Sequence, residues 1–179
     1  MLIDSILTTS TEAPVEYSRA MFLMQQTYAT LFSLANKLQV KGDQYLKHLT
    51  SRQLMTMIAI GHLPEDEASL NNIARKLGTT KQSVKQLVTL IERDGYVVTM
   101  PSARDRRAVN VVITEAGKEA LIEDYLLGLK LFDDLFHDFS LEEMEVLWGL
   151  LKKLYRFDGE EQDGFEGDMR INQPANGGS

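Results

Sequence analysis

The sequence predicts a mainly α-helical protein with one small β-hairpin, an α+β fold. Apolar residues recur at steps of three and four through most of the chain, the spacing of amphipathic helices. After Gly95 this spacing changes to two, and two short segments rich in β-branched residues follow, separated by a polar loop. We expect a single domain over residues 1–157 and a disordered acidic tail over residues 158–179.

Two helices are expected in the first third of the chain. Residues 15–41 carry an apolar stripe with Met21, Met24 and Leu31, which predicts one long amphipathic helix. Thr50 is followed three residues later by Gln53, a capping-box pattern that predicts the start of a second helix. The stretch from Gly61 to Pro64 is expected to end it.

Two shorter helices are expected next. Ser69 precedes a short apolar-periodic run that stops at Gly78, which suits a helix C-terminus. Thr79 and Thr80 then offer caps for a further helix, whose apolar face includes Val84, Val88 and Ile91. Asp94 and Gly95 are expected to close that helix.

The hairpin and the last two helices complete the prediction. Strands are expected at Tyr96–Met100 and Val109–Ile113, joined by the polar loop Pro101–Ala108. A long helix is expected from Thr114, and Ser140 with Glu143 forms a second capping box before the last helix. We therefore expect a central lobe at about residues 50–114, with dimerisation helices at about residues 15–41 and 114–157.

The charge distribution points to a polyanionic partner for the central segment. The chain has a net charge of −7, yet residues 71–118 carry nine Lys and Arg against four Asp and Glu, a net charge of +5. The remainder therefore carries −12. A basic segment inside an acidic chain is typical of a small nucleic-acid-binding unit.

The two short helices joined at Gly78 fit a helix-turn-helix, and the hairpin after them adds a wing. The second helix presents Lys81, Gln82, Lys85 and Gln86 away from its apolar face, and these side chains can contact base edges or phosphate. A solvated polar face is the alternative for this helix taken alone. Arginines at the loop tip can enter a narrow minor groove, whereas the alternative of surface charge paired with a single Asp cannot account for all three.

The same residues resemble the MarR (multiple antibiotic resistance regulator) family of winged-helix transcription regulators. The matching runs are Leu70-Asn-Asn-Ile-Ala-Arg-Lys-Leu-Gly78, Gln86-Leu-Val-Thr-Leu-Ile-Glu-Arg-Asp-Gly-Tyr-Val97 and Asp105-Arg-Arg-Ala-Val-Asn-Val-Val-Ile-Thr-Glu-Ala-Gly117. The third is the most specific, because the family's wing carries Asp-x-Arg followed by a strand and a Thr-Glu-x-Gly helix start.

The resemblance implies double-stranded DNA as partner, with Arg107 in the minor groove, oriented by Asp105, and the helix from Thr80 to Thr89 in the major groove. The residues expected at DNA are Thr79, Thr80, Lys81, Gln82, Ser83, Lys85, Gln86, Thr89, Arg104, Asp105, Arg106 and Arg107. The resemblance also implies a homodimer built from the terminal helices, and the alternative is that these helices only form a monomer core. We favour the homodimer, because a small lobe cannot cover two long apolar faces.

A transcription regulator of this family, most often a repressor, is commonly released from its pseudo-palindromic operator by a small-molecule effector. By position, Tyr28, Phe32, Met57 and His62 are candidate ligand-binding residues. No cofactor is expected. Two alternatives stay open for the winged unit: a protein-interaction module, and an architectural DNA-binding protein with little sequence preference.

Several classes of function are excluded by composition. The chain has no cysteine, so thiolate metal sites and thiol catalysis are absent, and no phosphate-binding glycine loop is present. Asp133 and His137 lie one helical turn apart, but a solvated acidic face explains them better than a metal site. We expect no enzyme activity. Without a secretory leader or an apolar run long enough to cross a bilayer, the protein is expected to be cytoplasmic with no membrane partner.

Overall fold

The computed structural model describes residues 15–102, 109–159 and 165. The chain divides into two compact units, residues 1–40 and residues 41–179, which are described separately. The first contains most of helix α1, Val15–Gly42. Several of its large apolar side chains are more than half exposed, namely Phe22, Met24, Tyr28 and Phe32.

The second unit begins with three helices that form the center of the winged lobe. They are α2 (Ser51–His62), α3 (Leu70–Lys76) and α4 (Lys81–Arg93). Each begins at the expected cap, because Thr50, Ser69 and Thr80 accept a hydrogen bond from the backbone N–H three residues later. The turn between α3 and α4 uses Gly78 at φ +61°, a left-handed conformation that glycine adopts without strain.

A two-stranded antiparallel hairpin follows α4. Strand β1 (Val97–Pro101) pairs with β2 (Val109–Ile113), with Val97 opposite Ile113 and Pro101 opposite Val109. The other edge of β2 is tied to the segment before α3, since the Val111 N–H donates to the Ala68 carbonyl at 2.9 Å. The hairpin is thereby fixed against the helix-turn-helix.

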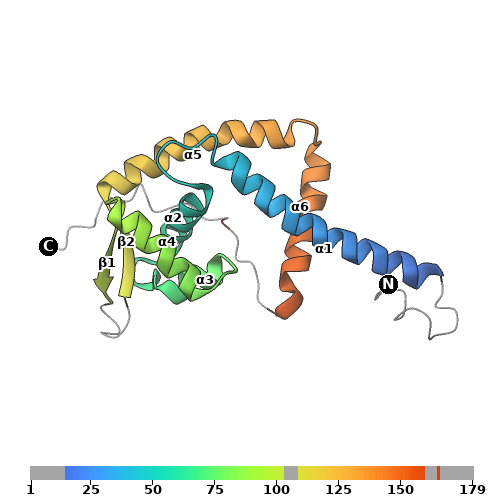
Figure 1. The fold of residues 1–179 in the computed structure, drawn as a ribbon, viewed down its shortest axis with the longest axis horizontal. Helices are drawn as coiled ribbons and strands as arrows, with labels where there is room; N and C mark the ends of the chain where they lie inside the picture. The colour runs from blue at the N-terminus through green and yellow to red at the C-terminus, as the bar shows by residue number, and fades with distance from the viewer. Residues whose placement is uncertain (1–14, 103–108, 160–164, 166–179) are drawn as a thin grey trace, which may run out of the picture. The chain divides into compact units, whose positions relative to one another are not determined.

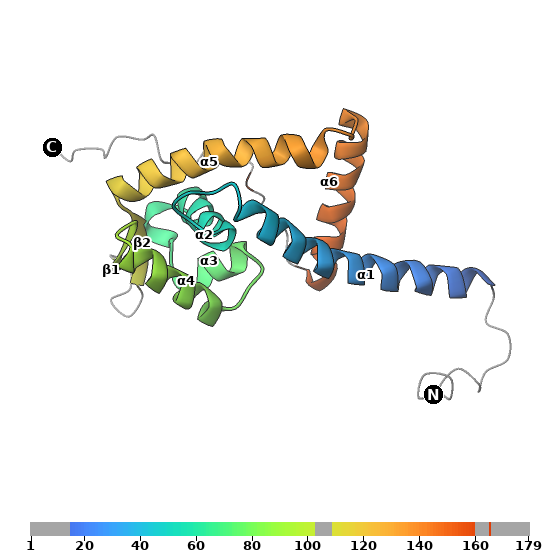
Figure 2. The same cartoon turned by 45° about the horizontal axis from the view of Figure 1, so that its top comes forward.

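Two helices complete the second unit. Helix α5 (Glu115–Phe136) leaves the hairpin as one long element, and α6 (Leu141–Tyr155) follows after a turn (Figures 1 and 2). Ser140 and Glu143 form the expected capping box of α6. None of the 15 residues of α6 is buried, so its apolar side chains find little cover within one chain.

The core of the second unit lies between α2, α3, α4, the hairpin and the start of α5. Its fully buried large apolar side chains come from all of these elements, and they are Met57, Ile73, Val84, Ile91, Val97, Val111 and Leu121. The apolar face predicted for α4 is therefore confirmed, because Val84, Val88 and Ile91 are buried in this core.

The structure departs from the sequence predictions at a few places. Strand β1 begins at Val97 rather than Tyr96, and two short 3₁₀ helices, Glu65–Glu67 and Arg156–Asp158, were not predicted. Phe165 is partly buried and packs against the core. Within the described ranges, no helix is long and apolar enough to span a membrane.

Candidate nucleic-acid interface

Helix α4 separates its side chains into two faces. Val84, Val88 and Ile91 are buried, whereas the candidate residues on the opposite side are exposed. These exposed residues are Lys81, Gln82, Lys85, Gln86 and Thr89. The predicted polar face therefore exists as one continuous surface over three turns of helix, with donors and acceptors suited to base edges.

The N-terminus of α4 is held by a local hydrogen-bond pair. Thr80 Oγ1 accepts the Ser83 N–H at 3.1 Å and lies 2.9 Å from Ser83 Oγ. Ser83 is partly buried, while Thr79 and Thr80 are exposed. The first-turn N–H groups of α4, with Lys81 beside them, favour an anionic group such as a phosphate at this end.

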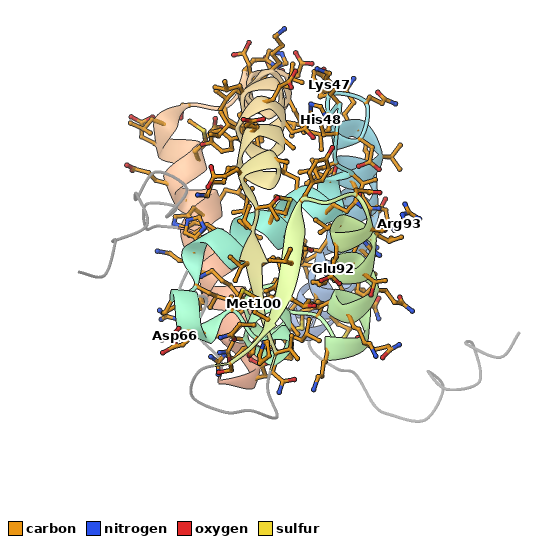
Figure 3. The ribbon with its side chains drawn as sticks, turned by 90° about the vertical axis from the view of Figure 1, so that its left-hand side faces the viewer. Lys47, His48, Asp66, Glu92, Arg93 and Met100 are labelled. Carbon is orange, nitrogen blue, oxygen red and sulfur yellow. The ribbon has the colours of Figure 1, made fainter. Side chains whose placement is uncertain are left out.

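The C-terminal part of α4 is joined to the wing. Glu92 Oε1 accepts hydrogen bonds from the Thr99 N–H at 2.8 Å and the Thr99 hydroxyl at 2.7 Å. Glu92 lies beside β1 in Figure 3, whereas Arg93 points away from the strand and pairs with Asp94 at 3.3 Å. Glu92 thus fixes β1 relative to α4, and sequence reasoning missed this role.

The wing-tip residues Arg104, Asp105, Arg106 and Arg107 lie outside the described residues. The structure defines the two ends of the segment that carries them, since Pro101 and Val109 pair across the hairpin. Their assignment to DNA stays a prediction.

The four candidate effector residues lie in different environments. Tyr28 and Phe32 are exposed neighbours on α1, with ring centroids 5.0 Å apart. Met57 is completely buried in the core, and His62 is partly buried at the end of α2 with Nδ1 2.9 Å from the Ile58 carbonyl. Because α1 and α2 fall mainly in separate units, a shared pocket stays a prediction.

A second missed residue joins α5 to the segment before α2. Asp124 is completely buried, and its carboxylate accepts the backbone N–H groups of Lys47, His48 and Leu49 at 2.7 to 3.2 Å. The neighbouring Glu123 pairs with the side chains of Lys47 and His48, each at 2.7 Å, and Figure 3 labels these two partners. Nothing in the sequence distinguishes Asp124 from the exposed acids around it.

The possible metal ligands on α5 make only local contacts. His137 donates its backbone N–H to the Asp133 carbonyl, and its side chain lies 3.2 Å from Asp138. In the part of the chain that the structure describes, no three His, Asp or Glu side chains converge on a metal-sized site.

These elements define a winged helix-turn-helix protein: a three-helix lobe, a polar reading helix and a hairpin fixed beside it. Comparison with known proteins agrees. Residues 49–108 match the sequence model of the MarR family. The transcriptional activatory protein BadR of Rhodopseudomonas palustris is 28% identical over 141 residues, covering 75% of this chain and 79% of BadR.

Solved structures show the same fold. The MepR–DNA complex from S. aureus is similar with a TM-score of 0.65 at 25% identity, covering 72% of this chain and 95% of MepR. The organohalide-sensing regulator RdhR, solved with 2,4-dichlorophenol bound, gives a TM-score of 0.67 at 16% identity, covering 84% and 89% of the two chains. The predicted resemblance to the MarR family is confirmed: residues 49–108 match the model of that family, and the chain has the winged-helix fold of similar transcription regulators.

Proposed function

We propose that this protein is a repressor that binds a pseudo-palindromic operator as a homodimer. The exposed polar face of α4 carries the proposal, because Gln82 and Lys85 project from the same side of a helix whose opposite face is locked into the core. The similar MepR was crystallised with DNA. Two copies related by a two-fold axis would place their α4 helices in successive major grooves, about 10 base pairs apart.

The wing supplies the second proposed DNA contact. Residues 103–108 connect the paired ends of β1 and β2 and contain Arg104, Arg106 and Arg107 with a single acid, Asp105. Arginine in a narrow minor groove meets the most negative potential on the duplex. We assign Arg107 to that groove and Asp105 to its orientation.

The homodimer is proposed to form through the terminal helices. On α5 and α6, large apolar side chains such as Leu126, Phe132, Leu150 and Leu154 are 46% to 59% exposed within one chain. Large apolar side chains left exposed along two helices indicate an interface. A second copy is the occupant that the symmetry of an operator requires.

A small aromatic effector is proposed to weaken DNA binding. RdhR binds 2,4-dichlorophenol, and this chain offers the aromatic pair Tyr28 and Phe32 together with His62. Met57, the fourth candidate residue, is completely buried in the core of the second unit. We assign no catalytic activity, and we place the protein in the cytoplasm with the DNA that it regulates.

Selection of bound sequences from random duplexes tests the proposal. The parent protein should enrich an inverted repeat. Gln82→Ala should relax the preference at particular base pairs and cost about 1 to 3 kcal/mol per half-site where a base contact is lost. Gln44→Ala is the matched control, because Gln44 is exposed in the loop after α1 and should leave selection unchanged.

The two alternative functions give different outcomes. An architectural DNA-binding protein would bind all duplexes with the same salt-dependent affinity and enrich no motif. A protein-interaction module would not be retained on duplex DNA or heparin. Either outcome contradicts sequence-specific regulation.

A further inference from the structure

Thr89 lies on the face of α4 that is opposite the core. It is exposed, whereas Val84, Val88 and Ile91 on the other side of the helix are buried. Thr89 follows Gln82 by seven residues, and seven residues make almost two full turns of an α-helix. The two side chains therefore lie nearly in line along the same exposed surface.

The hydroxyl group of Thr89 bonds to its own helix. Thr89 Oγ1 donates a hydrogen bond to the backbone carbonyl of Lys85 at 2.9 Å. This carbonyl belongs to the residue four positions earlier, a common acceptor for a threonine within a helix. A hydroxyl has a single hydrogen, so this bond leaves the Thr89 side chain no donor for a base edge.

The methyl group of Thr89 is the part of the side chain that is left for another contact. Beyond Cβ, a threonine side chain consists of one hydroxyl and one methyl group. Because the hydroxyl of Thr89 bonds to the backbone and the residue is exposed, the methyl group is available for an apolar contact. In the major groove, the C5-methyl of thymine is the apolar group that a base presents, and a threonine methyl is one of its usual partners.

The neighbouring side chains of the polar face have a different chemistry. Gln82, Lys85 and Gln86 end in amide or ammonium groups, which hydrogen-bond to base edges or phosphate. Leu90 is apolar and 39% exposed, but it follows Thr89 by one residue and so lies about 100° away around the helix. Within the polar face of α4, the apolar contact therefore falls to Thr89.

We propose that Thr89 recognises the C5-methyl of one thymine in each operator half-site through its own methyl group. This inference rests on the proposed binding of α4 in the major groove. Gln82 hydrogen-bonds to a base edge, and Thr89 adds an apolar contact two turns further along the helix. Two turns rise about 10 Å, the length of about three base pairs, so the two recognised positions lie about two to three base pairs apart.

Deoxyuridine in place of thymidine tests the contact, because it removes the C5-methyl and keeps the base-pairing edge. Each thymine of the operator selected from random duplexes is replaced in turn, at the same position of both half-sites, and duplex affinity is measured at fixed salt. At one position the parent should bind the deoxyuridine duplex about tenfold more weakly. Each of the two lost methyl contacts should change affinity about three- to fourfold.

Two substitutions separate the methyl group from the hydroxyl group. Thr89→Ser keeps the hydroxyl and loses the methyl, so it should bind the thymine and deoxyuridine duplexes equally at that position. Thr89→Val keeps a methyl and loses the hydroxyl, so it should retain the preference for thymine. Ser, Thr and Val have similar helix propensities, and the position is exposed, so the fold should not change. Gln82→Ala is the matched control: it should bind more weakly overall and keep the same preference for thymine.

The contrary results are distinct. If the parent selects an operator but binds every deoxyuridine duplex like the original, the methyl contact is overturned and the proposed function is not. A thymine preference that persists in Thr89→Ser would also overturn the contact, because its cause would then be DNA shape. So would a preference that Thr89→Val loses, since it would depend on the hydroxyl. A parent that selects no operator would overturn the proposed function, and this inference with it.

Discussion

Asp124 on α5 accepts the backbone N–H of Leu49 at 2.7 Å, across 75 residues of sequence. The same carboxylate also accepts from the N–H groups of Lys47 and His48. Leu49 immediately precedes Thr50, the cap of α2. The buried Asp124 side chain therefore fixes the start of the winged lobe to α5, the long helix proposed for dimerisation. A change in the position of α5 would therefore reach the lobe directly.

Asp124→Ala should destabilise the fold strongly. The substitution leaves the buried Leu49 N–H and the part-buried N–H groups of Lys47 and His48 without their acceptor, at a cost of about 3 kcal/mol. Urea unfolding followed by circular dichroism measures the loss. Asp133→Ala on the exposed side of the same helix is the control and should stay within about 0.5 kcal/mol of the parent. Equal unfolding midpoints for the two variants would contradict the structural role of Asp124.

The Glu123 carboxylate should add a small acid-sensitive contribution to stability. The hydrogen bond from Lys47, then that from His48, lowers the pKa of Glu123 below its ordinary value of 4.5. A carboxylate whose pKa is lower in the folded than in the unfolded protein stabilises the fold at pH values above its unfolded-state pKa. This stabilisation is lost as the pH falls through its folded-state pKa. The thermal midpoint of the parent should thus fall below about pH 4.5 more steeply than that of Glu123→Gln. Parallel curves would exclude this contribution.

Gly117 should not tolerate a larger residue. A Cβ atom at this position would lie 1.9 Å from the backbone oxygen of Tyr96, so α5 or the start of the hairpin must shift. Gly117→Ala should therefore cost about 1 to 3 kcal/mol in a denaturant titration. Gly128→Ala in the same helix meets no atom within 4 Å and should be neutral or stabilising. The opposite order of stability would contradict this close approach.

The parts of the fold that the sequence predicted best depend on local interactions. Thr50, Ser69, Thr80, Thr114 and Ser140 each cap the helix that follows through an N–H three residues away, so a short window of sequence contains both partners. The exposed polar face of α4 was predictable for the same reason, because its buried residues recur at helical spacing within one segment.

The missed features depend on contacts between distant residues. Asp124 resembles the exposed acids of α5 until its partners at residues 47–49 are placed beside it. Phe165 lies in an acidic, Gly-rich composition that predicts disorder, and its ring contacts His62 and Lys76, which lie far away in the sequence. Local periodicity contains no information on either pairing.

The terminal helices should hold two copies together. Leu150→Glu places a charge on the uncovered apolar surface of α6, where Leu150 is 59% exposed, and should shift the protein from dimer to monomer in sedimentation experiments at micromolar concentration. Met55→Glu on α2 is the control at another exposed apolar position and should leave the dimer intact. A parent protein that sediments as a monomer would contradict the dimer itself.

Arg107→Ala should weaken binding to nearly every duplex rather than to particular sequences. A minor-groove arginine reads groove width and potential, so its loss removes charge neutralisation common to all sites. The slope of log affinity against log salt should fall by about one per subunit. Arg93→Ala is the matched control, because Arg93 lies at the far end of α4 and pairs with Asp94. Affinity and slope should be measured on the selected operator and on a scrambled duplex.

The direction in which Asp105→Ala changes DNA affinity distinguishes an orienting role of Asp105 from simple charge repulsion. Removing an acid near DNA should by charge alone strengthen binding, since one repulsive contact with phosphate is lost. If Asp105 orients Arg107, its removal should instead weaken binding to both duplexes, although less than Arg107→Ala. Tighter binding by Asp105→Ala would show that the acid only repels DNA. Parent-like binding of Arg107→Ala to both duplexes would leave α4 as the sole DNA-reading element.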